Sequence, residues 1–196
     1  MKTFALIGLL SLAALGVALP LTTKSKPAQP DKQTTPDKSR LDRGRYLVSF
    51  GGCSDCHTPL KMGPKGPEPD MTRLLSGHPE TAKLPPPPKL ENTPWFAATA
   101  GMTAWSGPWG ISYAANLTPD QNTGLGIWTE EMFVRALRIG KHMGASRDIL
   151  PPMPWQNIAA LSDEDLKAIF AYLRSIPAIQ NHVPAPAVSG GEADYE

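Results

Sequence analysis

The sequence predicts a single, mostly α-helical domain with a long irregular segment between its first and later helices. Helical signals occur in three segments, residues 39–50, 129–139 and 162–175. Between the first and second of these, residues 58–115 are rich in glycine and proline, which argues against long regular elements. The last helix has an apolar face, and Gly44 in the first would let the two backbones approach closely, so we expect these two helices to pack against each other.

Composition divides the rest of the chain into three further segments. Residues 1–18 begin with a basic Lys2, continue as an uninterrupted apolar run and end in small residues, which predicts a cleaved signal peptide. Residues 19–38 are polar and rich in Thr, Lys and Pro, which is typical of a flexible linker. Residues 177–196 are rich in Pro, Ala and Gly and predict a disordered tail. The folded domain is therefore expected at residues 39–176.

An uncleaved membrane anchor is the alternative to a signal peptide, because no charge occurs between Lys2 and Lys24. A spanning helix needs about 20 apolar residues, and the run from Phe4 to Ala18 is slightly shorter. We therefore expect export to the periplasm, with membrane attachment only if this segment is retained. The formal charge of the whole chain is +1, which argues against nucleic acid as a partner.

Capping residues mark the ends of the three predicted helices. Ser39 is the expected N-cap of the first helix, and Thr129 and Ser162 are the expected N-caps of the second and third. Gly140 is placed to end the second helix. The last helix has an apolar stripe at helical spacing, which predicts a core face: Leu166, Ile169, Phe170 and Leu173.

The most specific motif is the run Cys53-Ser54-Asp55-Cys56-His57, a C-x-x-C-H sequence. Two thiols at this spacing reach the two vinyl groups at one edge of a haem, and the adjacent imidazole binds its iron. The motif occurs once and contains both cysteines of the chain. We therefore expect one covalently attached haem c, with Cys53 and Cys56 as thioethers and His57 as the proximal iron ligand.

A bare C-x-x-C also occurs in zinc sites and in thioredoxin-like redox pairs. Zinc needs a second pair of ligands, whereas the other histidines, His78, His142 and His182, are isolated in the sequence. A thioredoxin-like site follows a βαβ pattern, and the flanks here are helical or rich in Gly and Pro. Both alternatives are therefore less well supported than haem attachment.

Two further stretches give the chain a resemblance to a known family. They are NLTPD at residues 116–120, followed by TGLGIWT at 123–129, and LPPMPW at 150–155. Together with the haem motif they resemble the haem domains of the multihaem cytochrome c subunits of membrane-bound alcohol, gluconate and fructose dehydrogenases. The resemblance implies a class I cytochrome c fold, whose N- and C-terminal helices cross over one haem. This chain differs from those subunits in carrying one C-x-x-C-H motif.

The resemblance also implies a distal ligand, because these domains use a methionine on a loop shortly before the last helix. Met153 has this position, between Pro152 and Pro154, whose rings restrict the loop backbone. His142 is the main nitrogen-donor alternative. The other methionines lack the family position: Met62, Met71, Met102, Met132 and Met143.

The aromatic residues of the 58–115 segment leave two interpretations open. In the first interpretation they line the haem pocket and hydrogen-bond a propionate. In the second they only pack the segment onto the domain. They are Trp95, Trp105, Trp109 and Tyr113.

The resemblance implies an electron carrier and not an enzyme. Its partners would be redox proteins, namely a dehydrogenase as electron donor and an oxidase or another cytochrome as acceptor. A peroxidase-like haem enzyme and a haem-based redox or gas sensor are the alternatives. Both require a coordination position that opens to an external ligand, and a Met153-ligated iron does not offer one.

Overall fold

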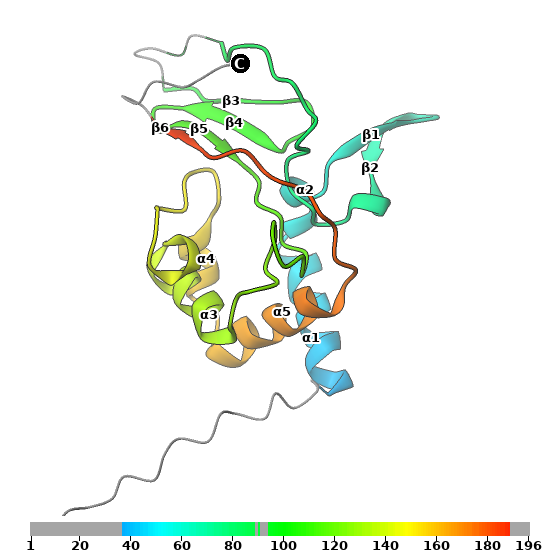
Figure 1. Ribbon diagram of the computed structural model, residues 1–196, viewed down its shortest axis with the longest axis vertical. Helices are drawn as coiled ribbons and strands as arrows, with labels where there is room; N and C mark the ends of the chain where they lie inside the picture. Colours follow the sequence, from blue (N-terminus) through cyan, green and yellow to red (C-terminus); the bar gives the residue numbers. More distant parts are fainter. Residues whose placement is uncertain (1–36, 89, 91–93, 189–196) are drawn as a thin grey trace, which may run out of the picture. The chain divides into compact units, whose positions relative to one another are not determined.

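The computed structural model describes residues 37–88, 90 and 94–188 (Figure 1). The predicted signal peptide and nearly all of the predicted linker lie outside these residues, as does the end of the predicted tail. The helices are α1 (Lys38–Phe50), α2 (Cys53–His57), α3 (Glu130–Ile139), α4 (Trp155–Ala159) and α5 (Asp163–Ser175). The strands are β1 (Leu60–Gly63), β2 (Gly66–Pro69), β3 (Ala97–Ala98), β4 (Ala104–Gly107), β5 (Gly110–Tyr113) and β6 (Ala187–Val188). Among these elements, none of the helices is long and apolar enough to cross a membrane.

Two of the three predicted N-caps are confirmed. The hydroxyl of Thr129 accepts a hydrogen bond from the amide of Met132 at the start of α3, and Ser162 caps α5 in the same way. The prediction for α1 is wrong by two residues. Asp37 is the N-cap, because its carboxylate accepts a hydrogen bond from the amide of Arg40 at 2.8 Å. The hydroxyl of Ser39 donates to the same carboxylate.

Helices α1 and α5 pack against each other, as predicted, through a close contact at Gly44 (Figure 1). A Cβ atom on Gly44 would lie 2.0 Å from the carbonyl oxygen of Ala168 and 2.8 Å from the Cβ of Tyr172. Only glycine allows the two backbones to approach this closely. The core around this contact contains Leu47, Val48, Leu75, Leu125, Phe133, Leu137, Leu166, Ile169, Phe170 and Leu173.

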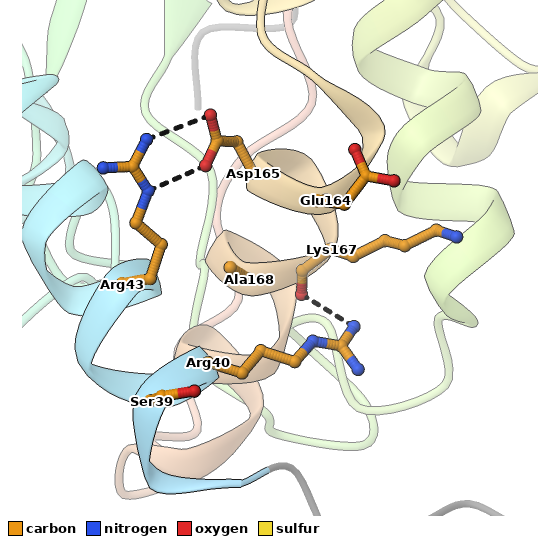
Figure 2. Close-up of a pocket in the computed structure, with 7 residues that line it drawn as sticks. All are labelled: Ser39, Arg40, Arg43, Glu164, Asp165, Lys167 and Ala168. Carbon is orange, nitrogen blue, oxygen red and sulfur yellow. Dashed lines mark hydrogen bonds and ion pairs between the residues drawn. The ribbon is translucent and has the colours of Figure 1, made fainter.

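Ion pairs reinforce the α1–α5 contact at its surface (Figure 2). Arg43 donates two hydrogen bonds to the carboxylate of Asp165, at 2.8 and 3.1 Å. Arg40 donates to the carbonyl of Lys167 at 3.1 Å and pairs with Glu130 on α3. Arg40, Arg43, Asp165 and Lys167 line a cavity of about 350 Å³ whose wall has no Cys, His or Met side chain, so it is not the candidate haem site.

The segment at residues 58–115 contains short strands, and the expectation of a mostly α domain is not confirmed. Strands β1 and β2 form an antiparallel hairpin, with Leu60 opposite Pro69 and Gly63 opposite Gly66. Strands β3, β4, β5 and β6 form a second antiparallel sheet in that order. No strand described in this segment exceeds four residues, in line with its content of Gly and Pro.

The prediction of a disordered tail is wrong for residues 177–188, here called the C-terminal strap. Asn181 of the strap is fully buried. Its side-chain amide donates to the carbonyls of Ser76 and His78, at 2.7 and 2.8 Å, and its side-chain oxygen accepts from Arg73 and the amide of Glu80. The strap then adds strand β6 to the edge of β5 (Figure 1). Specific hydrogen bonds therefore order a segment whose composition predicts disorder.

Candidate haem site

Helix α2 brings the three side chains of the C-x-x-C-H motif to one face. Cys53, Cys56 and His57 are related by steps of three and four residues, which share a face of an α-helix. Gly52 precedes them with φ = +64°, a conformation that glycine adopts without steric cost. Both cysteines are free and partly buried, and burial raises the pKa of each thiol above its ordinary value. The thiols are therefore neutral at neutral pH.

The imidazole of His57 is buried and held in one orientation. Its Nδ1 atom lies 2.7 Å from the carbonyl oxygen of Ala115. Since a carbonyl only accepts, Nδ1 carries the proton and Nε2 is left with a lone pair, the form that ligates iron. Burial lowers the pKa of His57, so the ring is neutral at neutral pH.

Two loops surround the haem motif and hold it in place. The backbone amide of Leu75 donates a hydrogen bond to the hydroxyl of Thr58 at 3.0 Å. The backbone carbonyl of Leu75 accepts a hydrogen bond from the amide of Leu117 at 2.9 Å. In the next residues, Asn116 accepts hydrogen bonds from the amide and hydroxyl of Thr118. The NLTPD stretch is thus a structured loop, and it directly follows Ala115, whose carbonyl oxygen contacts His57.

A cavity of about 600 Å³ lies beside α2 and brings the predicted ligands together. Cys53, Cys56, His57 and Met153 all line it. Its volume lies within the range of cofactor pockets, and its lining is mostly apolar. A pair of thiols, a neutral imidazole and a thioether on the wall of one apolar cavity fit the donor set of a covalently bound haem c.

The loop that carries Met153 is tied to the elements on either side of it. The hydroxyl of Ser112 on β5 donates to the carbonyl of Pro151 at 2.5 Å. The amide of Ile149 donates to the carbonyl of Gly140, at the end of α3. Gly140 has φ = +66°, and a Cβ there would lie 2.4 Å from the ring of Trp155. Met153 itself is partly buried against the core.

The structure also brings the nitrogen-donor alternative to this cavity. His142 lines the wall, and its ring meets the ring of Trp128 edge-on at 5.1 Å between centroids. His182 of the C-terminal strap lines it as well, whereas His78 is buried elsewhere and bonded to Thr103. The cavity lining includes none of the five other candidate methionines: Met62, Met71, Met102, Met132 and Met143.

The aromatic residues of the 58–115 segment divide between the two interpretations. Trp105 and Tyr113 line the cavity. Trp109 lies outside its lining and donates its indole N–H to Ser112, and Trp95 is largely exposed. Sequence reasoning missed two parts of the wall, Arg147 and residues 182–186 of the strap. No local pattern marks them, because tertiary contacts bring them to the cavity.

No family model matches the chain. Three curated proteins are similar to most of it. It is 29% identical to a subunit of nicotinate dehydrogenase from Pseudomonas putida, over 89% of this chain and 12% of that protein. It is 28% identical to the fructose dehydrogenase cytochrome subunit of Gluconobacter japonicus, over 90% of this chain and 31% of that protein. It is 32% identical to the gluconate 2-dehydrogenase cytochrome c subunit of Pantoea cypripedii, over 80% of this chain and 27% of that protein.

These similarities define the class of protein. Over most of its length the chain is related to the cytochrome c subunits of alcohol, gluconate and fructose dehydrogenases, as its motifs predict. It spans less than a third of the length of each of these relatives.

Proposed function

We propose that this chain is a monohaem c-type cytochrome with the cytochrome c fold that carries one electron at a time. Cys53 and Cys56 hold one haem c through thioethers, and His57 and Met153 are the axial ligands of its iron. The observation that carries the proposal is that all four side chains line one cavity of about 600 Å³.

The bound haem would supply the ferric–ferrous couple, and the residues around it set how readily the electron is taken up. His57 enters as a neutral imidazole whose orientation is set by the carbonyl of Ala115. A thioether from Met153 favours the ferrous state and raises the reduction potential relative to a second imidazole. With both axial positions filled by protein, external ligands have no site, so the function is electron transfer and not peroxidase chemistry or gas sensing.

The partners we propose are redox proteins in the periplasm. The names of the fructose and gluconate relatives support a dehydrogenase as the electron donor. The acceptor would be an oxidase or another cytochrome. Because this chain has one C-x-x-C-H motif, electrons would pass between its haem and haems of other proteins. The chain would attach to the membrane only if its N-terminal apolar segment is retained.

Haem content tests the proposal directly. The protein is produced in a host with c-type cytochrome maturation, denatured, stained for haem and assayed as its pyridine haemochrome. We expect covalent haem at one per chain, and a ferrous form that does not bind carbon monoxide. Zinc without haem would contradict the proposal, and so would a native ferrous form that binds carbon monoxide readily.

A further inference from the structure

The cavity wall contains one fixed positive charge. Among all the residues that line it, Arg147 is the only Lys or Arg, and Asp55 is the only Asp or Glu. Arg147 lies in the loop between the helical turn His142–Gly144 and Met153. Its backbone is held there, because its carbonyl accepts a hydrogen bond from the amide of His142 at 2.8 Å.

Arg147 makes no ion pair within the part of the chain that the structure describes. The adjacent carboxylate, Asp148, pairs instead with Lys141 at 2.6 Å. The guanidinium has one long contact of 3.4 Å, with the carbonyl of Asp148. Most of its five N–H groups are therefore free for an acceptor that the protein itself does not supply.

Arg147 is an exposed residue, but the protein atoms near it partly desolvate the guanidinium and lower its pKa. Burial together with the positive charge of Arg147 also lowers the pKa of His142. A cation that is partly removed from water is stabilised by a carboxylate with hydrogen-bonding geometry. A planar guanidinium matches a carboxylate through two parallel N–H···O bonds.

We propose that Arg147 binds a propionate carboxylate of the haem, an inference that rests on the proposed function. One electrostatic effect on the reduction potential follows. At the iron, the positive charge of the guanidinium offsets the negative charge of the propionate, which disfavours the more positive ferric state. Arg147 is therefore a residue that both positions the haem and raises its reduction potential.

Voltammetry of matched variants tests this role. Arg147→Gln removes the charge from the cavity wall, whereas Arg135→Gln removes an equal charge from an exposed position on α3 outside the cavity lining. We expect a lower midpoint potential for Arg147→Gln only, with an Fe–S(Met) absorption band unchanged in both variants. Equal potentials in the two variants would overturn the proposal.

A second measurement covers the case in which Arg147→Gln yields no haem protein. Arg147→Lys keeps the charge but loses the forked geometry, so we expect a shift of the propionate bending mode in its resonance Raman spectrum. An unshifted mode, as expected for Arg135→Gln, would overturn the proposal. A wild-type chain without covalent haem would instead contradict the proposed function, and haem staining detects that failure before any potential is measured.

Discussion

The Nδ1 atom of His57 donates a hydrogen bond of 2.7 Å to the carbonyl oxygen of Ala115, which lies 58 residues further along the chain. This bond leaves the lone pair on Nε2, the nitrogen that would ligate iron in the proposed function. The carbonyl belongs to the loop anchored to Leu75, so the orientation of His57 depends on tertiary structure as well as on the C-x-x-C-H motif. Substitutions of the ligands and of the contacts that support them should therefore have separable effects.

Replacing Cys53 or Cys56 with Ala should prevent normal attachment of haem through two thioethers and leave much of the protein degraded. These are the only cysteines, so no disulfide can replace the covalent link. Haem-stained gels of each variant measure the effect, with Ser54→Ala as the control between the two thiols. Haem that resists acid–acetone extraction at full yield in both single variants would refute the assignment.

Gly44→Ala should lower the free energy of unfolding by about 1–3 kcal/mol, the usual cost of overpacking. The added Cβ would lie 2.0 Å from the backbone oxygen of Ala168, so helices α1 and α5 must move apart. Gly101→Ala is the matched control, since the nearest atom to its Cβ is the hydroxyl of Thr103 at 3.7 Å. Urea denaturation measures both variants, and equal stabilities would show that the α1–α5 contact is looser than described.

Asn181→Ala should destabilise the domain by more than the roughly 1–3 kcal/mol expected for one unsatisfied buried group. The side chain donates hydrogen bonds to the carbonyls of Ser76 and His78. It accepts hydrogen bonds from Arg73 and from the amide of Glu80, so the substitution leaves four groups without this partner. Thermal unfolding followed by circular dichroism measures the loss. Asn157→Ala, at an exposed position on α4, is the control, and a loss no greater than in this control would refute the role of the strap.

Asp165→Asn should weaken the dependence of stability on pH in acid. The hydrogen bond from Arg43 is the main cause that lowers the pKa of Asp165 below its usual 3.8. Because the folded-state pKa is lowered, the pair with Arg43 stabilises the folded state above the usual pKa. This stabilisation is lost as pH falls through the lowered value. The pair is exposed, so we expect about 0.2–1 kcal/mol.

Urea denaturation midpoints across this acid range measure the Asp165 effect. Glu164→Gln is the matched control, because it removes a neighbouring charge from the same first turn of α5 (Figure 2). Identical acid profiles for Asp165→Asn and the wild type would show that the Arg43–Asp165 pair contributes nothing to stability.

Sequence reasoning predicts the parts of this protein that depend on local signals. The caps Thr129 and Ser162 and the close approach at Gly44 follow from spacing and residue type, and the C-x-x-C-H run marks Cys53, Cys56 and His57 as one site. The N-cap of α1 is harder to place, because two capping residues, Asp37 and Ser39, compete within one turn.

The rest depends on contacts between segments that are distant in the sequence. The strap is rich in proline and alanine, and only the hydrogen bonds of Asn181 with residues about a hundred positions earlier explain its order. In the same way, Arg147 resembles an ordinary surface charge until the fold brings it to the cavity wall. Strand β6 could not be predicted, because it forms on the edge that β5 provides.

The ligand assignment is tested most directly by the absorption spectrum of the oxidised protein, compared with that of Met153→Ala. We expect an Fe–S(Met) charge-transfer band in the wild type and in the control Met143→Ala. In Met153→Ala we expect the band to be lost, the midpoint potential to fall, and the ferrous form to bind carbon monoxide. A band that persists in Met153→Ala, or a wild type that lacks it and changes its spectrum in His142→Ala, would contradict ligation by His57 and Met153.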